Sequence, residues 1–198
     1  MILTKSFLEN QAKNRGIYYT DMAEYRSINE NNEIIRKSLT NEYDIFLSHS
    51  YYDKRLVLTL VDLFHSAGYS VYVDWIEDEQ LNRSSVNKST ANILKVRMKN
   101  SKGLSYLTTQ NSSNSKWCPW ELGYFDGLKK SRCCILPVLD YNQDSFHGQE
   151  YLGLYPYIDY NTRSDNGEFD FWVYDPNDRR KYVILKSWLS GYDPISHN

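Results

Sequence analysis

The segment most suggestive of chemistry is residues 115–127, SKWCPWELGYFDG, which sets the acidic Glu121 among tryptophan, tyrosine and phenylalanine side chains. In a helix, Glu121 would fall within an apolar stripe made by Trp117, Trp120, Tyr124, Phe125 and Leu128. Carboxylates held in apolar surroundings are frequent at functional sites, because they can stabilise a developing positive charge there. The segment therefore indicates a candidate catalytic carboxylate.

A structural role for Glu121 is the alternative, and the pattern alone favours it. Proline is preferred at the first helical position, so Pro119 would make Cys118 the N-cap and Glu121 the third helical residue. A glutamate there can accept a free backbone N–H, as in a capping box, and suits the positive end of the helix. Against this role stands the apolar stripe, since a capping side chain would more comfortably face water.

Other chemistries have less support in the sequence. The four histidines show no metal-ligand spacing with the cysteines, and no glycine-rich phosphate-binding motif follows an expected strand. Cys118 has no histidine near it in sequence to activate it, although His49 could approach it in space. Asp53 and Asp74 end expected strands and could be second carboxylates, but such residues are more often caps or turn formers. We therefore expect no metal site.

Strands and helices alternate around this segment. Apolar runs predict five strands, at residues 43–48, 70–74, 103–108, 133–139 and 155–160. Helical spacing predicts helices at 56–67, at 86–100 and around Glu121, with a long loop at 75–85. The C-terminal part predicts an extra edge strand at 169–174 and a closing helix at 179–190.

This alternation predicts an α/β fold with a doubly wound, mostly parallel five-stranded sheet of the flavodoxin-like type. In its order 2-1-3-4-5, ligands bind at the carboxyl ends of the strands, where the order reverses. The loops 48–53 and 108–118 would meet at that point, and Glu121 follows the second loop. The fold alone thus places Glu121 beside the expected cleft.

Composition limits the classes of partner. The 198 residues suffice for one domain with a core, and the formal net charge of −2 without a long basic run argues against duplex nucleic acid. The three cysteines do not form a disulfide framework, and Cys133 and Cys134 lie in an apolar run as expected buried thiols. No segment has the length of a signal-peptide core or a membrane span, so we expect a cytoplasmic protein without a membrane partner.

Three segments, in this order, resemble motifs of Toll/interleukin-1 receptor (TIR) domains. They are YDIFLSHS at 43–50, followed by Asp53; VYVDW at 71–75; and SKWCPWE at 115–121, with the S-x-x-C-x-x-E spacing of TIR domains that cleave NAD. The chain resembles stand-alone bacterial TIR proteins, such as the TIR component of Thoeris antiphage systems. We place the TIR domain at 42–192. Residues 1–41 form an N-terminal extension with one or two short helices, which could cover the cleft as an inhibitory arm or complete the core.

The resemblance implies an NAD+ glycohydrolase or cyclase with Glu121 as the catalytic carboxylate. Nicotinamide leaves NAD+ as a neutral base, so the enzyme needs no general acid and must instead stabilise an oxocarbenium-like ribose in a held geometry. NAD+ is then a substrate, and no cofactor is required. Water would give ADP-ribose, adenine a cyclic isomer, and another nucleophile a conjugate; the latter two could signal to a separate effector in antiphage defence.

The resemblance also implies binding residues in the first loop. Ser48, His49 and Ser50 should line the cleft and contact the ribose or the phosphates of NAD+. Many family members carry an arginine in this loop, where this chain has His49 and Tyr51.

Further binding residues are expected around the loop after the second strand. Asp74, Trp75 and Arg83 belong to this region, which in the family helps to complete the site, often across a subunit contact. A solvated loop charge for Arg83 and a packed ring for Trp75 are the structural alternatives. Self-association is therefore expected to gate activity.

The segment before Glu121 supplies the last set of expected binding residues. Ser115 and Cys118 should shape the loop, while Trp117 and Trp120 could stack on nicotinamide or adenine or pack in the core.

Two other functions remain open at this stage. A non-catalytic TIR adaptor shares the fold and acts by TIR–TIR association, but it has no need of a carboxylate in an apolar stripe. An enzyme like the nucleoside deoxyribosyltransferases would also use a carboxylate at the anomeric carbon, and would form a covalent sugar adduct on it.

Overall fold

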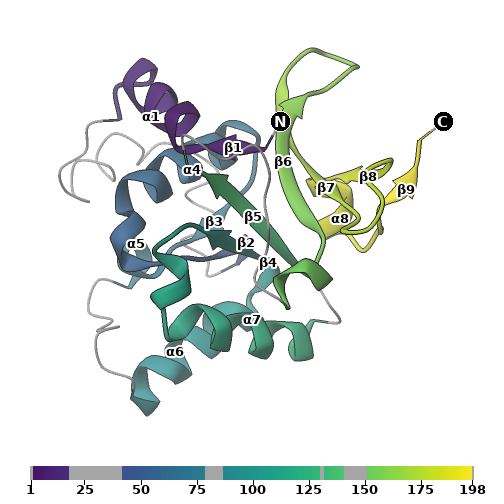
Figure 1. Ribbon diagram of the computed structural model, residues 1–198. Helices are drawn as coiled ribbons and strands as arrows, with labels where there is room; N and C mark the ends of the chain where they lie inside the picture. Colours follow the sequence, from purple (N-terminus) through teal and green to yellow (C-terminus); the bar gives the residue numbers. More distant parts are fainter. Residues whose placement is uncertain (1, 18–41, 79–86, 130–131, 141–150, 198) are drawn as a thin grey trace.

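A sheet with helices on both faces forms the body of the protein. The computed structural model describes residues 2–17, 42–78, 87–129, 132–140 and 151–197 (Figure 1). Five parallel strands make its centre in the order β3-β2-β4-β5-β6. They are β2 (Tyr43–Ser48), β3 (Val71–Tyr72), β4 (Ser101–Thr108), β5 (Cys133–Leu139) and β6 (Tyr157–Thr162). This is the predicted order 2-1-3-4-5, and the doubly wound fold is confirmed.

Each face of the sheet has its own apolar core. Ile45 and Leu47 of β2 pack with α4 (Lys54–Ser66) and α1 (Lys5–Asn14), which lie on one side of the sheet in Figure 1. Phe46 points to the other face, where it packs with α6 (Lys88–Lys99) and α7 (Trp117–Leu128). Successive strand residues face opposite sides of a sheet, so both faces of a fully covered strand must be apolar. The run at 43–48 is apolar because both faces of β2 are covered by helices.

Short helical turns complete the connections. They are η1 (Tyr51–Asp53), α5 (Asp74–Glu77), η2 (Ser112–Asn114) and η3 (Leu152–Leu154). The prediction of a loop from residue 75 onward was therefore wrong at its start, since α5 begins at Asp74 directly after β3. Residues 79–86 lie outside the described part of the chain.

The C-terminal part differs from the prediction. The strand expected at 169–174 is present as β7 (Phe169–Tyr174), but it is not an edge strand, because β8 (Lys181–Ile184) and β9 (Ile195–Ser196) continue the sheet in antiparallel pairing. The prediction of a single closing helix at 179–190 was wrong, since only α8 (Leu185–Leu189) is helical in this segment. Instead, Tyr182, Val183 and Ile184 of β8 pair with β7. Strand pairing in the folded protein thus outweighs the weak helical spacing of this segment.

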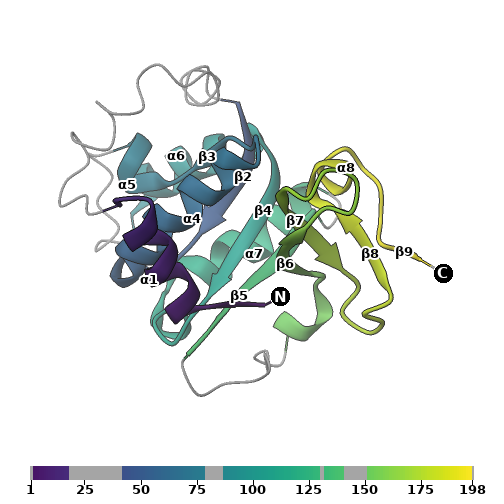
Figure 2. The ribbon, with the colours of Figure 1, turned by 90° about the horizontal axis from the view of Figure 1, so that it is seen from above.

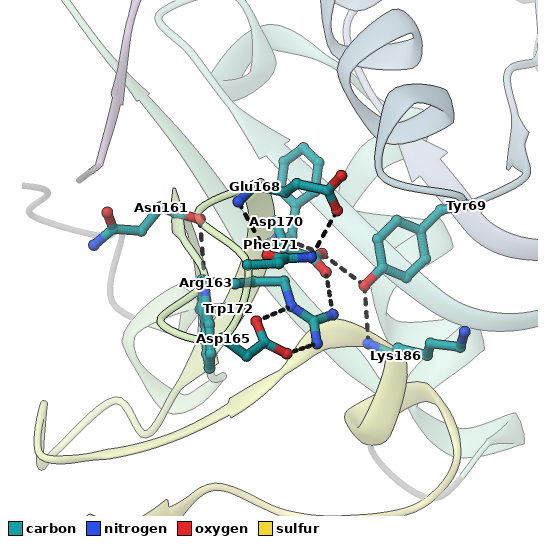
Figure 3. Close-up of polar contacts among 10 residues, drawn as sticks. Tyr69, Asn161, Arg163, Asp165, Glu168, Asp170, Phe171, Trp172 and Lys186 are labelled. Atoms are coloured by element: carbon teal, nitrogen blue, oxygen red, sulfur yellow. Dashed lines mark hydrogen bonds and ion pairs between the residues drawn. The ribbon is translucent and has the colours of Figure 1, made fainter.

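A buried tyrosine joins this antiparallel extension to the body of the fold (Figure 3). The hydroxyl of Tyr69, between α4 and β3, donates to Asp170 Oδ1 of β7 at 2.8 Å and accepts the backbone N–H of Lys186 in α8 at 3.1 Å. The Arg163 guanidinium lies 3.5 Å from the second oxygen of Asp170, and it also binds Asp165. Burial, together with the charge of Asp170, raises the pKa of Tyr69 above its usual range, so its hydroxyl stays protonated as a donor.

The first residues of the chain complete the core. Strand β1 (Leu3–Thr4) pairs in parallel with the end of β5, and α1 packs on α4 (Figure 2). The Thr4 hydroxyl caps α1 by accepting the N–H of Phe7, Leu8 is fully buried, and Arg15 donates to Asp62 of α4 at 2.7 Å. Of the two roles expected for the N-terminal extension, residues 2–17 therefore have that of completing the core. Residues 18–41 lie outside the described ranges.

Among the described residues, every helix is too short or too polar to cross a bilayer.

Candidate active site

The two loops predicted to meet at the reversal of strand order do meet. Asp53, at the end of η1, accepts hydrogen bonds from two residues that follow β4: Thr109 Oγ1 at 2.6 Å and Asn111 Nδ2 at 2.7 Å. Both carboxylate oxygens of this buried aspartate are thereby engaged by neutral donors. Asp53 thus ties the loops together, which is the structural role that its position at a strand end suggested.

Helix α7 begins earlier than the capping hypothesis requires. Its first residue is Trp117, with Lys116 in the N-cap position, so Pro119 is the third helical residue and Glu121 the fifth. The first N–H groups of a helix have no partner within it, so proline is tolerated here as well. The Ser115 hydroxyl accepts the N–H of Cys118 at 3.3 Å. The prediction of Cys118 as N-cap was wrong, and Glu121 is too far along the helix for the capping box.

Glu121 instead reaches the end of β2. Its Oε2 accepts a hydrogen bond from the Ser48 hydroxyl at 2.6 Å, and both residues are fully buried. A buried carboxylate is costly unless hydrogen-bond donors compensate for the lost hydration. Charge-assisted O–H···O⁻ bonds of this length are among the stronger ones in proteins. The sheet reversal therefore holds a carboxylate in an enclosed, largely apolar place, oriented by a hydroxyl from the neighbouring strand.

His49 is held in one neutral tautomer. Its Nδ1 lies 2.9 Å from the carbonyl oxygen of Leu47, which can only accept, and its Nε2 accepts the indole N–H of Trp75 at 2.7 Å. Asp74 Oδ1 lies 3.4 Å from the same Nε2. Both ring nitrogens of His49 are thus engaged inside the protein. In this conformation the ring holds Trp75 beside the site through the hydrogen bond to Nε2. Both ring nitrogens are used by these contacts and are not offered to a phosphate.

The other predicted binding residues divide into two groups. Ser50 is buried near the site and accepts the N–H of Tyr52 at 3.4 Å, and Cys118 is fully buried in α7. Trp120 stacks on Tyr124 and lies under the ammonium of Lys95 in α6, 6.0 Å from the ring centroid. It also makes a T-shaped contact with the buried Trp117 and packs against the core on this face of the sheet. Arg83 falls outside the described residues.

Tyr106 was missed in the sequence. It lies opposite Ser48 in the register of β2 and β4, and only 1% of it is exposed. Burial raises the pKa of Tyr106 above its usual range, and the negative charge of Glu121 acts in the same direction. Only the strand register could have revealed this tyrosine, since it sits within an ordinary apolar run.

The doubly wound fold and the buried carboxylate at the sheet reversal are the features expected of a TIR domain. The chain belongs to the TIR domain family, which matches residues 45–172. It is 50% identical over 148 residues to a protein of Bacillus cereus (strain MSX-D12) named as a probable 3' cyclic ADP-D-ribose synthase, ThsB'. That match covers 74% of this chain and 75% of the relative. It is also 36% identical over 107 residues to a protein of Cytobacillus dafuensis, provisionally named cyclic ADP-D-ribose synthase TIR2. That match covers 54% of this chain but only 27% of the relative.

Proposed function

We propose that this chain cleaves the nicotinamide–ribose bond of NAD+ and closes the ADP-ribose product into a cyclic nucleotide. The observation that carries the proposal is the Glu121 carboxylate, buried in the apolar stripe of α7 and bonded at 2.6 Å to the Ser48 hydroxyl at the sheet reversal. The names of both relatives, which refer to cyclic ADP-D-ribose synthesis, support the same reaction.

A single carboxylate suits this reaction. The pyridinium of NAD+ leaves as neutral nicotinamide, so no proton has to be delivered to it, and the developing charge is on the ribose. Glu121 opposes that positive charge and accepts ribose hydroxyls, while Ser48 fixes the orientation of the carboxylate. Low-dielectric surroundings strengthen this interaction relative to water.

The enclosed position of Glu121 also favours a cyclic product. Water competes with adenine for the ribose cation, and an enclosed site reduces the access of water. One of the relatives is named for a 3' cyclic product, and we propose a product of this kind for the chain. Such a nucleotide would act as a signal in antiphage defence when a separate effector protein binds it.

Self-association is part of the proposal. Glu121 and Ser48 are fully buried, so NAD+ reaches the carboxylate only when neighbouring residues move. Binding between TIR domains can supply the free energy for such a movement, as in other enzymes whose sites are completed by closure. Trp75 and His49, bonded to each other beside the site, are the described residues through which this movement would act.

Nicotinamide release from NAD+ by the purified protein tests the function. We expect Glu121→Gln to reduce the rate at least about 100-fold, as for the loss of one group that stabilises a transition state electrostatically. The matched control is Glu168→Gln, which changes an exposed glutamate in the turn between β6 and β7. Full activity of Glu121→Gln would refute the assignment. The absence of turnover by wild type at any protein concentration would favour the adaptor, and a sugar adduct on the protein by mass spectrometry would favour the transferase.

The same assay, run over a series of protein concentrations, tests self-association: a specific activity independent of concentration would contradict it. Extracts of infected cells that contain no nucleotide product dependent on Glu121 would contradict the signalling role.

A further inference from the structure

Lys54 presents a positively charged group beside the candidate active site. It is the first residue of α4, and its ammonium lies 4.1 Å from the ring centroid of Tyr51 and 5.2 Å from that of Trp75. Rings from η1 and α5 thus hold the cation in place, since an ammonium is attracted to the faces of both. Trp75 is in turn bonded to His49, the neighbour of Ser48. Contacts from Lys54 through Trp75 thus reach His49, and the next residue in the chain, Ser48, binds the Glu121 carboxylate.

The charge of Lys54 is not neutralised by an ion pair within the described residues. The adjacent carboxylate, Asp53, uses its two oxygens to accept from Thr109 and Asn111 instead. The lysine is half-buried, so its ammonium is fixed by the rings but is not enclosed. A cation in this state can bind an incoming anion without first breaking a salt bridge.

A groove beside Lys54 offers room for a ligand. It has a volume of about 290 Å³ and runs between α1 and the start of α4, where Lys54, Arg55, Tyr52 and Asn111 form part of its lining. Tyr52 is 83% exposed and makes a T-shaped contact with Tyr51, and its exposed ring can stack on a planar group. The N-terminal helix α1 supplies the opposite wall of this groove through Lys5, Leu8, Glu9 and Ala12, so the wall carries one cation and one carboxylate.

We propose that Lys54 binds the pyrophosphate of the dinucleotide, with Tyr51 and Trp75 positioning its ammonium. This assignment rests on the proposed function, because it takes NAD+ as the ligand. The substrate carries two negative charges between its nucleosides, whereas both ring nitrogens of His49 are engaged within the protein. Lys54, held between the rings of Tyr51 and Trp75, supplies a positive charge for the pyrophosphate.

Calorimetric titration of the full chain with ADP-ribose tests the assignment without any need for turnover. We expect Lys54→Gln to weaken the affinity for ADP-ribose about 10- to 100-fold, as for the loss of one hydrogen bond to a charged group. Lys54→Arg should retain most of the affinity, and added salt should weaken binding more steeply in wild type than in Lys54→Gln. The control is Lys102→Gln, since Lys102 is exposed and pairs with Asp44 at the opposite end of the sheet.

Steady-state kinetics separates a binding role from a general structural one. Lys54→Gln should raise KM for NAD+ by a similar factor with kcat nearly unchanged, and cleavage of nicotinamide riboside, which has no phosphate, should be unaffected. Equal affinity of wild type and Lys54→Gln for ADP-ribose would overturn the assignment, and so would the absence of ADP-ribose binding by wild type. Turnover that survives Glu121→Gln would instead refute the proposed function, and the ADP-ribose affinities would still decide the role of Lys54.

Discussion

Glu121 and Ser48 are 73 residues apart in the chain and form one buried hydrogen bond. The parallel pairing of β2 with β4, and the packing of α7 beneath them, bring the two side chains together. Because the carboxylate is enclosed, the orientation of its oxygens depends on a few donors and not on water. Loss of the Ser48 hydroxyl should therefore lower the rate of the reaction, because this hydroxyl orients the Glu121 carboxylate.

Removal of the Ser48 hydroxyl tests this dependence. We expect Ser48→Ala to reduce kcat/KM for NAD+ about 10- to 100-fold, because it removes one hydrogen bond to a charged group. The control is Ser113→Ala in the exposed turn η2, where the hydroxyl donates only to the carbonyl of Gln110. Nicotinamide release measures both variants, and a Ser48→Ala enzyme with unchanged kcat/KM would mean that Glu121 is oriented by other groups.

At the scale of elements, the antiparallel extension is attached to the TIR body by close packing and by one polar cluster. Gly103 of β4 allows α8 to approach, since a Cβ there would lie 2.6 Å from Leu189 Cδ2 and 3.0 Å from Trp188 Cζ3. Tyr69 adds the polar link, with a hydroxyl that donates to Asp170 and accepts from the backbone of Lys186. The extension is thus an integral part of the core, to which it contributes Phe171, Val173, Leu185 and Trp188.

Tyr69→Phe should destabilise the fold without affecting chemistry. The substitution leaves a buried carboxylate oxygen and a backbone N–H without this partner, at a cost of about 1–3 kcal/mol. Chemical denaturation measures the free energy of unfolding, and Tyr192→Phe, which alters a tyrosine that is 67% exposed, is the control. A destabilisation no larger than that of the control would show that the cluster contributes little to stability.

At the scale of the whole molecule, stability should depend on the pH through His65. Burial in the last turn of α4 lowers the pKa of His65 to about 4 from its ordinary 6.5. Between these two values the unfolded chain binds a proton that the folded chain does not. The stability associated with the neutral ring is therefore complete above pH 6.5 and is lost as the pH falls toward 4.

The size of this effect follows from the two pKa values. Between pH 7 and pH 4, wild type should lose at most about 3 kcal/mol more than His65→Gln, at about 1.4 kcal/mol for each pKa unit. Denaturation curves at several pH values measure the difference, and His197→Gln, at an exposed histidine, is the control. Parallel pH profiles of wild type and His65→Gln would contradict this prediction.

The amino-acid sequence by itself determined the sheet order, the family and the candidate carboxylate. Apolar runs mark buried strands whatever surrounds them, and the three TIR motifs lie on the elements that the runs predict. The start of α7, the role of residues 179–190 and the neighbours of Trp120 could not be obtained in this way. Each depends on which surface a segment packs against, and local spacing carries no information on that.

Only the tertiary structure decided which polar groups meet. Three contacts join segments that are separate in the chain. They are the contacts of Ser48 with Glu121, of Trp75 with His49, and of Lys54 with the ring of Trp75. Strand pairing and close packing set these distances, and a hydrogen bond requires them to be correct within a few tenths of an ångström. Residue types can therefore indicate a catalytic group, whereas its partners follow from the fold.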